Sequence, residues 1–412
     1  MGIVQAANRD SVRRRNLASL LAHVHHAGQI SRSALTAATG LNRSTVGALV
    51  TDLVARGLLE EGEPVGRGTP GRPSPQVHPK PDGVVVLAAE VEVSTISFAV
   101  AGLGGVLHEQ VRVDRAPDRR TPEATVEDLA ELISAARGRL DSERPVLGLG
   151  IAVAGVVRRE DGFVHVAPNL EWHDVPLAAM VAERLEQRLP VVMGNDADLG
   201  AMAEHIRGAG VGVDHLIYVA SEVGVGGGII IDGRPLTGAA GYAGEIGHIA
   251  VNPGGARCRC GAQGCLEAET GEWALLRHMG RASTNEREAV DEVLREAAIG
   301  DGVALRALET IGGWLGTGLA DLVNIFNPQR LVLGGMFAKA HPYLADAVRR
   351  ELDERVQSPS RGMVTVVPTT LGDDSTLIGA VELAFEPVLA DPTIIPLPGD
   401  LDDGGQDRRA LA

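Results

Sequence analysis

The chain has 412 residues, of which 44% are hydrophobic and only 3% are aromatic. This length allows two or three domains, whose cores must be filled by aliphatic side chains. No apolar run reaches the length of about 18 residues that a membrane span requires. Because charged residues such as Arg9 and Asp10 precede any apolar stretch, the N-terminus is not a signal peptide, and we expect a cytoplasmic protein without a membrane partner.

The net charge of −16 is unevenly distributed along the chain. Residues 1–80 contain ten Lys and Arg against five Asp and Glu, which gives +5, and the remainder carries −21. Such an asymmetry is typical of a small nucleic-acid-binding module attached to an acidic body. The acidic body would repel phosphates and so confine DNA to the module.

Residues 12–60 are predicted to form three helices. Leu17, Leu20, Leu21 and Val24 repeat with helical spacing, and Gly28 ends this first helix. Ser31 can cap a short second helix. After the turn at residues 40–42, a third helix carries its apolar residues at Val46, Leu49, Val50 and Leu53 and ends at Gly57.

The stretch 62–82 is rich in Gly, Pro and Arg and cannot be helical, because proline removes a hydrogen-bond donor and clashes with the preceding turn. We interpret it as a wing that runs into a linker, so that residues 1–80 form a winged helix-turn-helix. Its third helix would enter the major groove, and its arginines would reach phosphates or a narrow minor groove. The predicted DNA contacts are Asn42, Arg43, Ser44, Thr45, Arg67 and Arg72.

An alternative is that the three helices form a dimerisation module with a solvated basic face. The arginine-rich wing and the local charge of +5 favour DNA binding over this alternative. His23, His25 and His26 lie together near the end of the first helix without metal-ligand spacing, and we interpret them as a solvated surface patch.

The pattern after Pro81 is that of an α/β protein. Apolar runs suited to strands alternate with helical segments, the longest of which extends from about Val303 to Phe326. We expect a second domain at residues 81–386 and, at residues 387–412, a disordered tail rich in Pro, Gly and Asp. The expected strands are 84–89, 91–100, 146–153, 191–193, 216–220 and 331–333.

The three cysteines of the chain lie within eight residues and follow a histidine. His248, Cys258, Cys260 and Cys265 supply the four nitrogen and sulfur ligands of a closed, tetrahedral, structural zinc site. An odd number of cysteines does not indicate a disulfide framework, and a Cys-x-Cys pair is too close for an easy bridge. The remaining alternative is three unrelated buried thiols.

Several motifs resemble those of the ROK family of repressors, open reading frames and kinases. The His-x9-Cys-x-Cys-x4-Cys spacing, GAAGYAGEIGH, GCLE and the glycine-rich VGVGGGIIIDG all match, and the resemblance covers about residues 12–385. It is greatest to the family's transcriptional repressors that respond to sugars such as xylose or N-acetylglucosamine. The resemblance implies an α/β, actin-like sugar-kinase fold, of ribonuclease H-like type, with two lobes and a cleft, preceded by the mainly α winged helix-turn-helix.

The resemblance also implies a sugar site in that cleft. Carboxylates and amides on loops can satisfy the several hydroxyls of a sugar. His248 would offer one ring nitrogen to zinc and the other to a hydroxyl. The positions that match the family's sugar contacts are Gly155, Asn169, Asn195, Asp196, Glu245, His248 and Glu267, although Ala154 stands where the family usually has proline.

In kinase members the residue that matches Asp196 is the general base, but the phosphate loops of this chain depart from the kinase pattern. Glu92 and Val93 replace the two glycines of the first loop, and Val223 replaces the threonine of the second, after Glu222. Without these glycines the backbone cannot approach a phosphate closely, and the added acids would repel ATP. We therefore predict that kinase activity is lost and that no residue is catalytic.

The leading interpretation is a sugar-responsive regulator, acting as a repressor. Its partners would be a double-stranded DNA operator and a small sugar or sugar derivative, and zinc would be structural. A homodimer or homotetramer would place two DNA-binding modules at a spacing that the sugar changes. The alternatives are an active ATP-dependent sugar kinase with an appended DNA-binding domain and, less favoured, a structural zinc protein without a ligand.

Overall fold

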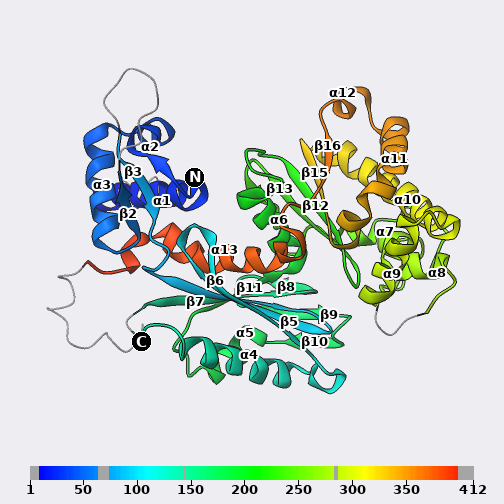
Figure 1. Cartoon of the computed structure of the whole chain (residues 1–412), viewed down its shortest axis with the longest axis horizontal. Helices are drawn as coiled ribbons and strands as arrows, with labels where there is room; N and C mark the ends of the chain where they lie inside the picture. The colour runs from blue at the N-terminus through cyan, green and yellow to red at the C-terminus, as the bar shows by residue number, and fades with distance from the viewer. Residues whose placement is uncertain (1–8, 64–73, 143, 283–285, 398–412) are drawn as a thin grey trace.

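The computed structural model describes residues 9–63, 74–142, 144–282 and 286–397, and they form a helical module and two α/β lobes (Figure 1). The module contains three helices and a three-stranded sheet in the order β1-β3-β2. Its helices are α1 (Arg9–Ala27), α2 (Arg32–Thr39) and α3 (Arg43–Ala55), and its strands are β1 (Ile30–Ser31), β2 (Leu59–Gly62) and β3 (Gln76–Pro79).

The expected cap of α2 and the expected ends of α1 and α3 are confirmed. The Ser31 side chain accepts a hydrogen bond from the backbone of Ala34 at the start of α2. Asn42, which was not expected to be a cap, does the same for Thr45 at the start of α3. Gly28 and Gly57 have positive φ angles after α1 and α3. The antiparallel β2 and β3 form the two sides of a wing, which completes a winged helix-turn-helix.

The first lobe is built on a five-stranded sheet in the order β11-β7-β4-β5-β6. Helices α4 and α5 cover one face of this sheet, and α13 covers the other (Figure 1). The strands are β4 (Val85–Val91), β5 (Thr95–Gly102), β6 (Val106–Asp114), β7 (Val146–Val153) and β11 (Val191–Asn195), and the helices are α4 (Pro122–Arg137), α5 (Leu177–Arg184) and α13 (Ser375–Ala390). A small antiparallel sheet at its edge contains β8 (Val156–Arg158), β9 (Phe163–Ala167) and β10 (Trp172–Val175).

The second lobe repeats the plan of the first. Its sheet has the order β14-β13-β12-β15-β16, so each lobe has an antiparallel meander extended by two parallel strands, although no sequence repeat is evident. Its strands are β12 (Leu216–Ser221), β13 (Val225–Ile231), β14 (Arg234–Pro235), β15 (Arg330–Gly334) and β16 (Thr365–Pro368). Its helices are α6 (Asp196–Arg207), α7 (Leu266–Thr270), α8 (Glu272–His278), α9 (Glu286–Ala298), α10 (Gly302–Phe326), α11 (Gly335–Arg355) and α12 (Ser358–Arg361).

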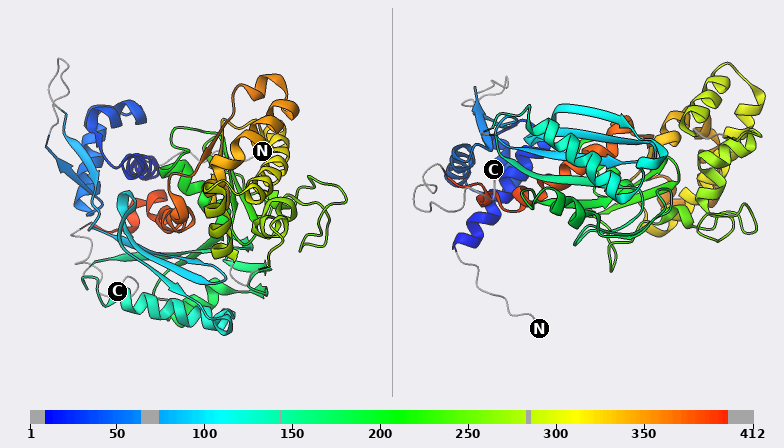
Figure 2. Two further views of the ribbon diagram at one scale, coloured as in Figure 1. Left: turned by 45° about the vertical axis from the view of Figure 1, so that its right-hand side comes forward. Right: turned by 90° about the horizontal axis from the view of Figure 1, so that it is seen from below.

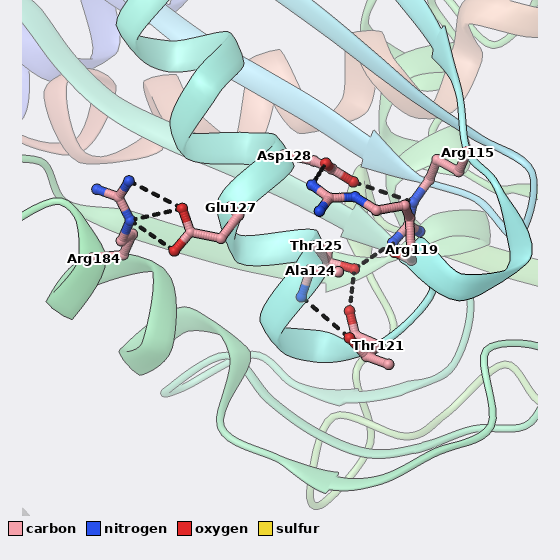
Figure 3. Close-up of polar contacts among 8 residues, drawn as sticks. All are labelled: Arg115, Arg119, Thr121, Ala124, Thr125, Glu127, Asp128 and Arg184. Atoms are coloured by element: carbon pink, nitrogen blue, oxygen red, sulfur yellow. Dashed lines mark hydrogen bonds and ion pairs between the residues drawn. The ribbon is translucent and has the colours of Figure 1, made fainter.

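Helix α4 is fixed to the first lobe by polar contacts at its N-terminal half (Figure 3). Thr121 caps the helix through the backbone of Ala124, and Glu127 pairs with Arg184 of α5. The buried Arg115 donates to the side chain of Thr125 and to the backbone carbonyl of Glu92, so it also holds the β4–β5 turn. These contacts join the outer helices to the turn that enters the cleft between the lobes.

Two sequence-based expectations about element boundaries are wrong. The run 91–100 is not one strand, because a turn at residues 92–94 separates β4 from β5. The disordered tail does not begin at residue 387. Helix α13 continues to Ala390 with Pro387 inside it, and the chain stays packed against the body as far as residue 397. Val388 and Ile395 are buried there, and apolar burial outweighs the Pro- and Gly-rich composition. Residues 398–412 lie outside the described residues.

The module and the first lobe share one hydrophobic core. The α1 residues Leu17, Leu20, Leu21 and Val24 are fully buried, as their spacing predicts, and they pack in one cluster with Leu377, Val381 and Phe385 of α13. Figure 2 shows α13 between the module and the sheet from a second direction. Among the described helices, none is both long and apolar enough to cross a membrane.

We predict that Phe385→Ala destabilises the module and the first lobe together. Phe385 is fully buried in the shared core, and loss of a buried phenyl ring costs about 3–5 kcal/mol of unfolding free energy. Calorimetry should show both parts unfolding at a lower temperature, whereas Ile325→Ala, at an exposed position, should leave the midpoint nearly unchanged. A shift confined to one of two separate transitions would contradict the shared core.

Candidate functional site

The four predicted metal ligands lie together in the second lobe. The ligand atoms of His248, Cys258, Cys260 and Cys265 are all within 4.8 Å of one another. Cys258 Sγ lies 3.8 Å from His248 Nδ1, and Cys260 Sγ lies 3.7 Å from Cys265 Sγ. Tetrahedral zinc with Zn–S bonds of about 2.3 Å separates two sulfurs by about 3.8 Å, so the four residues fit this ion.

The two ring nitrogens of His248 face different groups. Its Nδ1 lies toward Cys258, while its Nε2 lies 3.9 Å from Glu245 Oε2. Glu267 lies beside the same cluster, with Oε1 3.5 Å from Cys258 Sγ and Oε2 accepting a hydrogen bond from the backbone of Val225. The cysteine cluster is therefore continuous with carboxylates of the cleft.

A pocket lies between the two lobes, and three of the predicted sugar contacts line it: Gly155, Asn195 and Glu245. Gly155 comes from the β7–β8 turn, and Asn195 ends β11. The amide of Asn195 donates to the Gly155 carbonyl and its side-chain oxygen caps α6 at Asp198, so this residue is held rigidly. The opposite wall is formed by the start of β13 and the loop 241–245.

The other predicted sugar contacts lie outside the lining of this pocket. Asn169 and Glu267 approach each other near Gly224, where a Cβ would lie 2.6 Å from Glu267 Oε2 and 3.9 Å from Asn169 Nδ2. Asp196 is the first residue of α6, and burial raises its pKa to about 6 against the opposing hydrogen bonds of the helix N-terminus. The charges of Glu245 and Glu92, at the two ends of the cleft, raise the pKa of Asp196 further.

Three residues that sequence reasoning missed belong to this site. Asp198 lines the pocket, and burial raises its pKa to about 7, followed by the charge of Asp196. Its place two residues after Asp196, in the first turn of the same helix, is the signal that could have found it. Tyr242 lines the opposite wall. Arg259 donates to Asn169 Oδ1 at 2.6 Å and stacks over Trp273, a contact with no signal in the sequence.

The acids that replace the phosphate loops gather at the other end of the cleft. Carboxylate oxygens of Glu90, Glu92 and Glu222 lie within 4.8 Å of one another, at the ends of β4 and β12. Glu90 is only 3% exposed, and its Oε2 has no hydrogen-bond partner among the residues that the structure describes. Burial, then the charges of Glu222 and Glu92, hold the pKa of Glu90 well above its usual range.

Glu92, which was expected to repel ATP, is paired with two arginines. Arg287 of α9 lies 3.2 Å from Glu92 Oε1, and Arg112 of β6 lies 3.5 Å from Oε2. Arg287 also lines a second pocket with Glu222 and Lys339. Ion pairs therefore join α9 and β6 to the turn after β4, one of the two segments that depart from the kinase loop pattern.

Among the predicted DNA contacts at the start of α3, Arg43 and Ser44 are exposed and Thr45 is partly exposed, so DNA contact by them stays a prediction. The Oδ1 of Asn42 is engaged, because it accepts hydrogen bonds from Thr45 N and from the Ser44 hydroxyl. Arg67 and Arg72 lie outside the described residues. Part of the module's positive charge is also neutralised internally, by the pairs Arg13–Asp52, Arg56–Asp52 and Arg32–Glu61.

Glu222→Gln should stabilise the protein more at pH 8 than at pH 5. Burial, followed by the charges of Glu92 and Asp196, raises the pKa of Glu222 from 4.5 to about 8. Between these values only the unfolded state releases the proton, so this acid increasingly destabilises the native state as the pH rises. Thermal midpoints of wild type and variant at the two pH values test this. Glu160→Gln, on an exposed loop, is the control, and an equal gain at both pH values would contradict the pKa.

Comparisons with known proteins agree with this architecture. Residues 86–386 match the ROK family, and residues 18–68 match the MarR family. A xylose repressor of Bacillus subtilis (strain 168) is 30% identical over 386 residues, which cover 92% of this chain and 97% of the relative. A glucokinase of Streptomyces coelicolor is 32% identical over 319 residues, which cover 71% of this chain and 98% of the relative.

Solved structures give the same result. A ROK family transcriptional regulator described as a homolog of the E. coli MLC protein superposes with a TM-score of 0.75 at 25% identity, covering 92% of this chain and 97% of the other. A ROK family glucokinase from Streptomyces griseus, in complex with glucose and AMPPNP, gives 0.62 at 31% identity, covering 73% of this chain and 98% of the other. The kinases align without the N-terminal module, whereas the repressors align along nearly the whole chain. The chain belongs to the ROK family, and it carries an N-terminal MarR-type helix-turn-helix.

Proposed function

We propose that the protein is a sugar-responsive, DNA-binding transcriptional repressor. The observation that carries the proposal is the combination of two features. A winged helix-turn-helix packs on a two-lobe body, and the pocket between the lobes is lined by carboxyl and amide groups that can bind sugar hydroxyls. The similarity to xylose repressors along 92% of the chain supports it. Since xylose repressors and glucokinases are both relatives, D-xylose and D-glucose are the first sugars to test.

In this proposal the pocket binds a neutral sugar through its hydroxyls. Asn195 and Glu245 line the pocket, and Asp196, Asn169 and Glu267 would complete the ring when the lobes close. Each carboxylate accepts hydrogen bonds only, and each amide both donates and accepts, so the set can discriminate hydroxyl positions. Asp198 is added to the set because it lines the same wall.

Zinc would be a structural ion in this protein. Bound to Cys258, Cys260, Cys265 and His248 Nδ1, it would fix the imidazole so that Nε2 faces Glu245 and the sugar. The ion would thus order the loop 245–265, which contributes Glu245 to the pocket.

Phosphoryl transfer is not part of the proposal. ATP brings several negative charges that need cations to balance them. The region that would receive them holds Glu90 and Glu222, which cannot balance a negative charge in either protonation state, and Arg287 is already paired to Glu92. A homodimer is proposed because two modules at a fixed spacing can read two half-sites, and a sugar that shifts the lobes would change this spacing.

We predict near-stoichiometric zinc in the purified protein, as measured by elemental analysis. Cys260→Ser should reduce the zinc content and the thermal midpoint together, because structural zinc contributes directly to folding. Addition of a chelator should lower the wild-type midpoint and leave that of the variant unchanged. A metal-free protein of unaltered stability would rule out the site.

Asp196→Asn is the central test of the proposed function. A duplex selected from random DNA serves as operator, and the sugar is D-xylose or D-glucose, whichever raises the wild-type thermal midpoint. We expect the variant to bind that duplex as wild type does but to lose sugar affinity by about 1.5–3 kcal/mol, the contribution of a hydrogen bond to a charged group. Calorimetric titration measures the sugar, and mobility shift measures the duplex.

Asp346→Asn is the matched control, because its side chain is 88% exposed on α11. Unchanged sugar affinity in Asp196→Asn would show that the pocket lies elsewhere. A wild-type protein that binds sugar without any change in duplex affinity would overturn the proposed regulation.

A further inference from the structure

A buried polar cluster joins the DNA-binding module to both lobes. His25 of α1 is fully buried, and its Nε2 lies 2.9 Å from Glu382 Oε2 on α13. Arg207, the last residue of α6, donates from Nε to Glu382 Oε1 at 2.5 Å. The backbone N–H of Gly104, in the β5–β6 turn, donates to His25 Nδ1 at 3.0 Å. The interpretation of the three histidines as a solvated patch is therefore wrong for His25, which faces the body, whereas His26 is exposed and His23 is partly exposed.

His25 contacts the other three groups of this cluster. Its Nδ1 accepts a hydrogen bond from the backbone N–H of Gly104, and its Nε2 lies 2.9 Å from Glu382 Oε2 and 2.8 Å from Arg207 Nη2. Burial alone would raise the pKa of Glu382, but His25 and then Arg207 lower it to about 2, so this carboxylate is ionised although it is only 1% exposed. Both of its oxygens are engaged, one by the module and one by α6.

A contribution to the free energy of unfolding does not explain why the charged Glu382 lies in this core. The surrounding contacts are apolar: Phe385 lies 5.2 Å from the His25 ring, and Val24, Val381 and Leu21 belong to the same core. A buried ion pair in such a place is often no more stabilising than well-packed apolar residues. It does, however, allow only the arrangement in which all partners meet, and so it fixes the orientation of α1 relative to α13 and α6.

Helix α6 connects this cluster to the proposed sugar pocket. Asn195, Asp196 and Asp198 lie at its N-terminal end, and Arg207 lies at its C-terminal end. Near the first end α6 crosses α13 at very close range, because a Cβ on Gly379 would lie 2.0 Å from the Leu199 carbonyl oxygen. No side chain separates the two helices at this point, so it can act as a pivot.

The position of the pivot amplifies movement. With a rise of about 1.5 Å per residue, Asp196 lies about 4.5 Å from Leu199 and Arg207 lies about 12 Å from it on the other side. A small rotation of α6 about this crossing therefore moves Arg207 roughly two to three times as far as Asp196. Since α6 packs on the sheet of the second lobe and α13 on that of the first, lobe closure changes the angle between them (Figure 1).

We infer that Arg207, Glu382 and His25 are positioning residues that couple the sugar pocket to the DNA-binding module, with α6 as the lever. The inference rests on the proposed function. Sugar binding at Asp196 and Asp198 rotates α6, Arg207 moves relative to Glu382, and the constraint on His25 and α1 changes with it. The module is then reoriented as a rigid body, because α1 carries its whole apolar face into the shared core.

Glu382→Gln tests the coupling, since the amide keeps the shape and loses the charge that holds both partners. The readout is the ratio of affinities for the selected duplex without and with saturating D-xylose or D-glucose. Allosteric ratios are commonly about 5- to 150-fold, and we expect a wild-type ratio in this range and a ratio below about twofold in the variant. Calorimetric sugar affinity without DNA should stay within about twofold of wild type, because Glu382 does not line the pocket.

Asp391→Asn is the matched control, because it removes a carboxylate just after α13, beside Arg14 of the same α1, without touching α6. It should keep the wild-type ratio. Arg207→Met should reduce the ratio of duplex affinities as Glu382→Gln does. It serves as the test if Glu382→Gln does not fold. The coupling is reciprocal, so sugar affinity measured with and without the duplex must give the same ratio.

The outcomes separate the inference from the function on which it rests. A merely structural role would lower the thermal midpoint or both duplex affinities and leave their ratio unchanged, which would overturn the inference. A wild-type protein whose duplex affinity is the same with and without sugar would instead overturn the proposed function. Loss of the ratio in both variants, with sugar binding and the control intact, would establish the cluster as the coupling element.

Discussion

The close packing of α13 is the constraint on which the rest of this structure depends. One face of the helix lies on the first-lobe sheet so closely that a Cβ on Gly150 would lie 2.0 Å from the Ala380 carbonyl oxygen. Another face meets α6 at Gly379, and the remaining apolar residues share a core with α1 of the DNA-binding module. Because densely packed interiors do not deform continuously, these three neighbours must move as coupled bodies. The module is therefore not a freely tethered head.

The cleft between the lobes has two ends with different electrostatics. At the pocket end, Asn195, Asp198 and Glu245 line the cavity with two carboxyl groups and one amide. At the other end, Glu90 and Glu222 have raised pKa values, and Glu92 is paired with two arginines. The proposed function uses only the pocket end, and the arginines beside the acids of the other end are already paired with Glu92.

The cysteine cluster links local order to the pocket. Only nine residues separate His248 from Cys258, and this loop contains turns and isolated β-bridges rather than a helix or strand. A metal ion in this cluster would fix His248 on one side and, through Cys258, lie next to Glu267 on the other. Two of the proposed sugar contacts would then depend on an ion that never touches the sugar.

The sequence by itself determined the elements and the local chemistry. Periodic apolar residues and caps such as Ser31 specified the helices of the module, and the spacing of His248 and the cysteines specified a cluster that could hold a metal ion, because both depend on neighbours close in the chain. Only the tertiary structure decided the role of residues that act over long separations. His25 and Glu382 are 357 positions apart, and Arg287 and Glu92 are 195 apart, so no local pattern predicts that they meet. The burial of His25, the compensation of Glu92 and the order of the chain beyond Pro387 follow from packing between distant segments. Those contacts exist only after the lobes and the module have assembled.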